Sequence, residues 1–134
     1  INSDIKRIVG GGCEIKEVRY MDSVVWKKKN EYKFIIDPDS YNANVYIDNI
    51  KLASYYTTIN INDRTFILKV TFTRRNLSET VKIFINDTVI FNEKVDGEYE
   101  RDFNGPIYAY DIKKSFNTSV LDSNKVNSIK VVLS

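Results

Sequence analysis

The sequence predicts an all-β fold, an antiparallel β-sandwich of about 8–10 strands and of jelly-roll or immunoglobulin-like type. Along residues 66–73 the apolar side chains fall on one face of an extended chain, and Lys69, Thr71 and Thr73 fall on the other. A period of two over such a run is typical of a half-buried strand. Shorter alternating runs recur between turn residues, and no amphipathic helix can be recognised.

The candidate strands follow one another closely from Cys13 onward. Each is a short alternating or apolar run that suits a strand with one buried face. A slip of phase within residues 13–20 indicates a β-bulge. The candidate segments are 13–20, 24–26, 32–36, 45–47, 50–52, 55–61, 66–73, 81–85, 88–91, 99–103, 108–112 and 127–133.

Turn residues separate these segments, because Pro fixes φ and the side chains of Asp and Asn bond back to the main chain. The turn signals are Asp37-Pro38-Asp39-Ser40, Asp48-Asn49, Asn62-Asp63, Asn86-Asp87, Asp96-Gly97 and Asn104-Gly105-Pro106. We expect Asn62-Asp63 to close a hairpin between 55–61 and 66–73. Residues 74–79 are expected to form a polar loop.

The composition is that of one folded domain spanning residues 1–134. Hydrophobic residues make up 43% of the chain and charged residues 28%, which allows a core and argues against disorder. Residues 1–9 precede three glycines and form either an N-terminal arm that docks on a neighbour or the first strand. Cys13 is the one cysteine of the sequence, so no internal disulfide can form.

The absence of histidine restricts the chemistry open to this chain. It removes the commonest general base, the nucleophile pairs Ser-His and Cys-His, and the usual zinc ligand. Paired carboxylates can hydrolyse glycosides. However, Asp37 and Asp39 belong to a turn, and Glu98 and Glu100 alternate like a polar sheet face. We therefore expect a protein that is not an enzyme.

Asp37 and Asp39 are also weak candidates for a structural calcium site. Calcium takes about six to eight oxygen ligands, which a compact loop usually supplies. The run around these residues does not match a known calcium loop. We predict no metal and no cofactor, with a structural calcium ion as the alternative.

The charge of the chain is close to balanced, with a formal net charge of +2. A dedicated nucleic-acid binder usually shows a denser basic face, so no nucleic-acid partner is expected. No run approaches the about 18 apolar residues needed to span a bilayer, and no direct membrane insertion is expected. The chain begins at Ile1, as after removal of a signal peptide or anchor, or in a piece of a longer chain. We expect an extracellular or cell-surface location.

The last third of the chain carries a pattern of three segments. They are a strand that ends in an Asn-centred turn, an aromatic strand that enters Asp-Ile, and a closing Asn-x-Ile-x-Val. Here they read Val81-Lys82-Ile83-Phe84-Ile85-Asn86, Tyr108-Ala109-Tyr110-Asp111-Ile112 and Val126-Asn127-Ser128-Ile129-Lys130-Val131. This pattern resembles the C-terminal half of galactose-binding-like jelly-roll domains, although the usual Asn-Gly turn is Asn86-Asp87 here.

Galactose-binding-like domains are appended to many glycosidases and surface proteins, so the resemblance implies an architecture more than an activity. It implies structural roles for two residues, with Asp111 capping a short helical turn and Asn127 positioning a strand. Residues 111–116 are accordingly expected to form one helical turn with Asp111 as its N-cap.

Exposed aromatic side chains are the candidate binding residues, because carbohydrate sites use aromatic platforms beside amides or carboxylates. Tyr55 and Tyr56 are neighbours on an expected strand, so one of them should face solvent or a partner. Trp26 can equally be read as a core anchor. The candidates are Trp26, Tyr41, Tyr46, Tyr55, Tyr56 and Tyr99.

These observations predict a non-catalytic, extracytoplasmic recognition or assembly module. Its partner would be a surface or envelope protein or a second copy of itself. Edge-strand pairing, or a flat face rich in Tyr and aliphatic residues, would supply the contact. The alternative is a carbohydrate-binding ancillary module whose ligand is a glycan.

Overall fold

The computed structural model describes residues 30–134, and the part from Glu31 to Ser134 forms one compact unit. Ten strands and one short 3-10 helix lie within these residues, which confirms the predicted all-β sandwich. The described part contains no helix with the length and hydropathy needed to cross a membrane. Cys13, Trp26 and the predicted arm over residues 1–9 lie outside the described residues.

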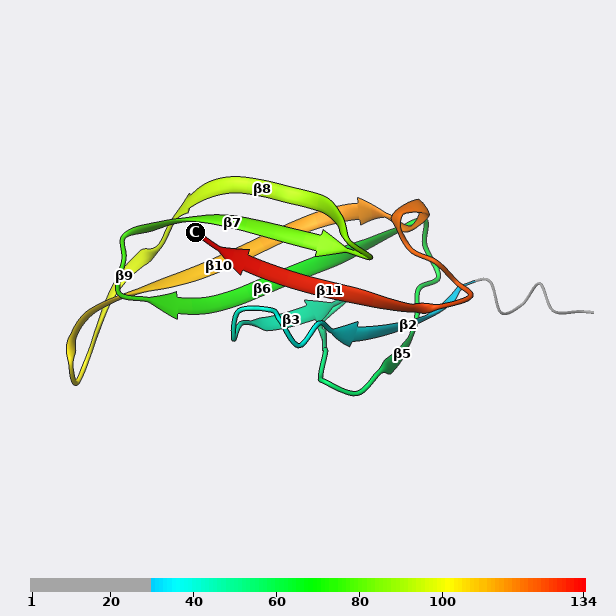
Figure 1. Ribbon diagram of the computed structural model, residues 1–134, viewed down its shortest axis with the longest axis horizontal. Coiled ribbons are helices and arrows are strands. Elements are labelled where there is room, and N and C mark those ends of the chain that lie inside the picture. Colours follow the sequence, from blue (N-terminus) through cyan, green and yellow to red (C-terminus); the bar gives the residue numbers. More distant parts are fainter. Residues whose placement is uncertain (1–29) are drawn as a thin grey trace, which may run out of the picture. The chain divides into compact units, whose positions relative to one another are not determined.

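The strands form two five-stranded sheets (Figure 1). Sheet I runs in the order β4-β3-β6-β10-β9, and its neighbouring strands are all antiparallel. Its strands are β4 (Ile50–Lys51), β3 (Asn44–Ile47), β6 (Thr65–Arg74), β10 (Gly105–Asn117) and β9 (Glu98–Asp102).

Sheet II runs in the order β5-β2-β11-β7-β8. The last strand lies beside the first described one, because β11 pairs with β2 in parallel, while the other pairs are antiparallel. Its strands are β5 (Thr57–Asn60), β2 (Glu31–Ile36), β11 (Val126–Leu133), β7 (Ser78–Ile85) and β8 (Thr88–Asp96).

The core lies between the two sheets. Every second residue of β6 and of β7 is buried, as the alternation of apolar residues predicted. Phe72 of β6 and Tyr110 of β10 stack at 4.6 Å between ring centroids. Removing these side chains from water is the main driving force that holds the sheets together. The buried apolar residues are Phe34, Val45, Ile47, Leu52, Ile59, Ile61, Phe66, Leu68, Val70, Phe72, Val81, Ile83, Ile85, Phe91, Tyr110, Ile112, Ile129 and Val131.

Two of the predicted turns close hairpins as expected. Asp48-Asn49 joins β3 to β4, and Asn86-Asp87 joins β7 to β8. All four residues have positive φ, between 48° and 69°. Asn and Asp tolerate this left-handed conformation better than other side chains, and its twist matches that of paired strands.

The predicted hairpin at Asn62-Asp63 is wrong. β5 belongs to sheet II and β6 to sheet I, so the chain crosses from one sheet to the other at this turn. Ile59 of β5 and Phe66 of β6 are both buried. Two strands with alternating apolar residues can face the same core either as neighbours in one sheet or as members of the two opposed sheets. Alternation alone therefore does not distinguish a hairpin from a crossing between sheets.

The predicted helical turn over residues 111–116 is also wrong, and Asp111 caps nothing. β10 continues to Asn117 and pairs with β6 as far as Thr65, because that partner strand satisfies its backbone groups. The helical turn follows later, as the 3-10 helix η4 (Thr118–Val120). Its N-cap is Asn117, whose side chain accepts a hydrogen bond from the Ser119 N–H at 2.8 Å.

The predicted polar loop over residues 74–79 is shorter than expected. Arg74 still belongs to β6, and β7 begins at Ser78. Glu79 is buried, and its carboxylate lies 3.2 Å from Arg74 Nε and accepts a hydrogen bond from the Asn76 amide at 2.7 Å. A buried carboxylate requires such partners, and these two residues supply them from the adjoining chain.

Asn127 ties together the end of the sandwich where β11 begins. Its side chain is fully buried. Oδ1 accepts hydrogen bonds from the Asn86 side chain and the Asp122 N–H, both at 2.8 Å. Nδ2 donates to the Lys33 carbonyl at 3.1 Å and to the Asp122 carbonyl at 2.9 Å. One amide therefore joins β2, the β7–β8 turn and the loop before β11.

We expect Asn127→Ala to lower the free energy of unfolding by about 3 kcal/mol, because buried donors and acceptors lose their partners. Urea denaturation measures this loss. Ser128→Ala is the matched control, since the next side chain is only half-buried and should cost about 0.5 kcal/mol or less. Equal losses for the two variants would contradict the role assigned to Asn127.

Candidate functional site

The outer face of sheet I carries a polar depression above β3, β6 and β10. Strand register places Thr71 of β6 between Asn44 of β3 and Asp111 of β10. In the next row, Thr73 lies beside Ala109. Thr71, Thr73 and Ala109 have small side chains, so they leave room between the longer side chains that flank them.

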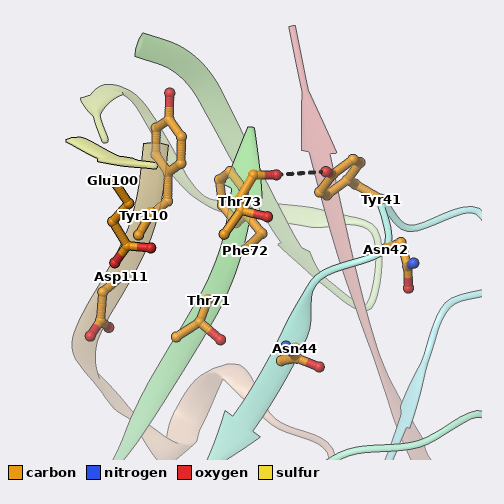
Figure 2. A pocket seen from close by; sticks show the side chains of 10 residues that line it. Tyr41, Asn42, Asn44, Thr71, Phe72, Thr73, Glu100, Tyr110 and Asp111 are labelled. Atoms are coloured by element: carbon orange, nitrogen blue, oxygen red, sulfur yellow. Dashed lines mark hydrogen bonds between the residues drawn. The ribbon is translucent and has the colours of Figure 1, made fainter. Parts of the chain in front are cut away.

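The depression has a volume of about 570 Å³. Figure 2 shows Asn42 and Asn44 on one side and Glu100 and Asp111 on the other, with Thr71 between them. This volume lies within the range of small-molecule sites, about 300–1,000 Å³. The lining residues are Tyr41, Asn42, Asn44, Thr71, Phe72, Thr73, Glu100, Ala109, Tyr110 and Asp111.

The lining offers amides, hydroxyls and carboxylates, and it includes neither lysine nor arginine. Amides both donate and accept hydrogen bonds, while ionised carboxylates accept them. Such a mixture can pair with hydroxyl groups, whereas an anionic ligand would meet two carboxylates without a cation. The depression therefore suits a neutral, hydroxyl-bearing molecule.

Tyr41 is held rigidly at the side of the depression. Its hydroxyl donates to the Thr73 carbonyl at 3.2 Å (Figure 2). Its ring packs edge-on against Phe72, with 5.6 Å between centroids. The Arg74 guanidinium carbon lies 5.2 Å from the Tyr41 centroid. Because these contacts engage the ring and the hydroxyl, Tyr41 forms a fixed wall.

The other predicted aromatic residues do not gather at one site. Tyr46 follows two residues after Asn44 on β3, and Lys69 Nζ lies 4.7 Å from its ring centroid. Tyr55 and Tyr56 precede β5 and are both exposed, and Lys33 Nζ lies 5.5 Å from the Tyr56 centroid. The predicted strand placement of this pair is wrong, because β5 begins only at Thr57, and outside a strand the two side chains need not point to opposite faces.

The acidic candidates lie apart from one another. Asp37 Oδ1 accepts a hydrogen bond from the Asp39 N–H at 2.8 Å, which is the turn that their sequence indicated. Glu98 and Glu100 lie on β9, whose residues are all exposed. Within residues 30–134, no three acidic or cysteine side chains come together as a metal-binding group. The structural calcium ion stays a prediction.

A second candidate site is the tip of the hairpin formed by β9 and β10, which projects at one end of the two sheets (Figure 1). Phe103 lies in its turn, directly after β9 ends at Asp102. Its relative exposure is 101%, so no described residue covers the ring. Tyr99 and Leu77 are each 58% exposed at the same end of the unit.

Arg75 holds this hairpin tip in one conformation. Its guanidinium makes a bidentate pair with the Asp102 carboxylate, at 2.9 Å and 2.7 Å. It also donates to the Pro106 carbonyl at 2.8 Å, and Asp102 Oδ1 accepts from the Asn104 N–H at 2.9 Å. The hydrogen bonds from Arg75 lower the pKa of Asp102 below its ordinary 3.8. The ion pair is therefore complete at neutral pH.

The base of the hairpin is fixed by close packing at Gly97. The Gly97 N–H donates to the Leu77 carbonyl at 2.7 Å, which links the β8–β9 turn to the β6–β7 loop. A Cβ at Gly97 would lie 2.6 Å from the Cβ of Tyr108, closer than atoms can approach. Only glycine lets the turn lie this near to β10.

Tyr99 was the one residue of this site that the sequence indicated. Phe103 was expected to continue the alternating strand, and Arg75 to lie in a polar loop. The sequence did carry a signal for the exposure of Phe103, because this residue directly precedes the turn residues Asn104-Gly105. An aromatic side chain at the edge of a turn has no strand face on which to pack. The bond between Arg75 and Asp102 joins distant segments, so no local pattern could show it.

No protein-family model, curated protein or solved structure matches this chain. The resemblance of the last third to galactose-binding-like jelly rolls gains no support from these comparisons and stays a prediction.

We expect the Arg75–Asp102 pair to be lost in acid. A carboxyl group with a lowered pKa stabilises the structure above its unfolded value near 3.8, and this contribution disappears as the pH falls through the folded pKa. The Asn104 amide resonance, followed by NMR from about pH 6 to 2, should shift with a midpoint below 3.8. Asp102→Asn should abolish the shift, and Asp111→Asn should not. A midpoint above 3.8 would contradict this account.

Proposed function

We propose that this chain is a non-catalytic recognition module that binds a protein partner through the β9–β10 hairpin tip. The observation that carries the proposal is Phe103, an aromatic ring that is 101% exposed on a turn held by Arg75. An exposed ring of this size leaves apolar area in water, and a partner pocket that covers it gains about 25 cal/mol for each Å² buried.

The rigidity of the tip favours binding as well. Ordering a flexible side chain or loop on association costs about 0.5–1.5 kcal/mol for each immobilised side chain. Arg75 spans the hairpin from Asp102 to Pro106, so the turn is already ordered before a partner arrives. Aromatic anchors that are fixed in this way are typical of interface hot spots.

The sheet edges are less suited to recognition. β8 is one outer strand of sheet II, and its register with β7 shifts between Ile83 and Phe84, which indicates a bulge. β9 is one outer strand of sheet I and is rich in charged residues. The other two outer strands are short, since β4 has two residues and β5 has four. Bulges and charges on an outer strand discourage pairing with another chain. Side-chain contact at the tip is therefore favoured over edge-strand pairing.

Site-specific photo-crosslinking tests the proposal. Phe103 is replaced by p-benzoylphenylalanine, and the chain is irradiated in the cells that naturally express it. We expect a discrete adduct with a protein, since the probe occupies the anchor position. The same replacement at Asn124, an exposed loop residue, is the control and should give none.

A third chain carries the probe at position 103 together with Arg75→Ala. Adduct yield should fall several-fold there, because the tip is no longer held. Absence of any adduct at position 103, or equal adducts at 103 and Asn124, would overturn the proposed function.

A carbohydrate-binding module is the second candidate, and the sheet I depression favours it. Its amides, hydroxyls and carboxylates suit a neutral saccharide, and Tyr41 and Tyr46 lie on or beside it. The predicted candidates Tyr55 and Tyr99 do not line the depression. This candidate therefore depends on Asn44, Thr71 and Asp111 rather than on an aromatic platform.

Glycan-array binding tests this second candidate. A saccharide bound in the depression should lose about tenfold or more in affinity with Asn44→Ala or Asp111→Ala, since each removes a hydrogen bond to the ligand. Lys113→Ala is the matched control, because that residue lies two positions along the same face of β10 and outside the lining. No glycan signal from the unaltered chain removes this candidate.

A further inference from the structure

The outer face of sheet II carries four lysines, one on each of four neighbouring strands. Alternation with buried residues turns Lys33, Lys82 and Lys130 outward, and Lys94 opposite Thr80 joins them. We call this surface the lysine face. Among the described residues, none of the four lysines forms an ion pair. The acidic residues of the lysine face, Glu31 and Asp96, lie at the ends of their strands, so positive charge dominates the middle of this face.

Apolar side chains lie between these lysines. Phe84 is opposite Lys130 in the register, and Lys130 Nζ lies 5.1 Å from its ring centroid. Val89 is 47% exposed and Val126 is 40% exposed. A surface that combines exposed apolar groups with positive charge fits a partner that combines an apolar anchor with negative charge.

The β9–β10 hairpin has this complementary chemistry. Glu98 and Glu100 are exposed on β9, and neither forms an ion pair among residues 30–134. Phe103 supplies the apolar anchor at the tip. Asp102 is already neutralised by Arg75, which leaves Arg101 as the cation of the strand. The hairpin therefore presents an aromatic ring in its turn, and two carboxylates without an ion-pair partner among the described residues on the outward face of the strand that leads to it.

We propose that the hairpin tip of one copy docks on the lysine face of a second copy of this chain. This inference rests on the proposed function, and it names the partner. Phe103 would contact the apolar groups around Phe84, while Glu98 and Glu100 would face the lysines.

The two surfaces are different parts of the molecule, so the contact is heterologous rather than a symmetric pairing of like with like. Each added copy leaves one free tip and one free face. Such a contact builds an open chain of copies unless the rotation between them closes a ring.

Sedimentation velocity of the full chain over a concentration series tests the inference, at low and at high salt. The unaltered chain should grow in size with concentration, and less so at high salt, because salt screens the charges. Glu98→Lys with Glu100→Lys, Lys82→Glu with Lys130→Glu, and Phe103→Ser should each weaken association by about tenfold or more. Circular dichroism shows that each variant is folded, and Phe103→Ser leaves every charge in place.

Mixing gives the sharpest result. Neither charge-reversed variant should associate with itself, because its tip and its face then carry charge of the same sign. In an equal mixture the unaltered tip of the Lys82/Lys130 variant fits the unaltered face of the Glu98/Glu100 variant, and the reversed tip fits the reversed face, so association should be restored. One chain that carries all four charge reversals should associate again, since the charges are complementary once more.

A chain that stays monomeric at every concentration overturns the second copy as partner, and so does association that the tip variants leave unchanged. The proposed function is judged separately by the adduct at position 103. An adduct with a different protein, from a chain that is monomeric, would preserve that function and reject only the self-association.

Discussion

The structure depends on one constraint, which is that two sheets share a single interior. Phe72 of β6, Ile83 of β7 and Ile129 of β11 belong to the same buried cluster although they come from both sheets. Because residues alternate along each strand, filling this interior also determines which side chains face outward. The polar depression on sheet I and the lysine face on sheet II are thus consequences of the core, since their residues occupy the positions between the buried ones.

Polar side chains complete the structure where the strands leave the core. Asn127 forms hydrogen bonds that join the strands at the end of the sandwich where β11 begins. The Arg74–Glu79 pair lies beside the loop that joins β6 to β7. Near that pair, the Tyr110 hydroxyl donates to the Asn76 carbonyl at 2.6 Å. Burial raises the pKa of Tyr110, with a further contribution from the charge of Glu79, so the phenol stays protonated and keeps this bond. Each of these groups satisfies backbone or charge that would otherwise be costly to bury.

The β9–β10 hairpin extends beyond the core, and polar contacts hold it as well. It gains little from the interior, as the full exposure of β9 shows, and its tip is held by the ion pair between Arg75 and Asp102. An exposed ion pair is usually worth little. This one is bidentate and is joined by bonds to main-chain carbonyls, which is the geometry in which such a pair orders a loop. Order at the tip, together with the exposure of Phe103, makes recognition the function that this surface supports best.

The sequence by itself determined the all-β class, the strands with a buried face and the hairpin turns at Asp48-Asn49 and Asn86-Asp87, because alternation and turn chemistry act between residues close along the chain. Only the tertiary structure decided that the Asn62-Asp63 turn crosses between sheets, and that β10 continues where a helical turn was expected. Both outcomes depend on which distant strand supplies the hydrogen-bond partners. The same reason applies to the sites. Tyr41 and Tyr99 could be named as candidates from their type. The depression around Asp111 arises from strand register, and the turn that carries Phe103 is held by an ion pair between segments that lie far apart along the chain.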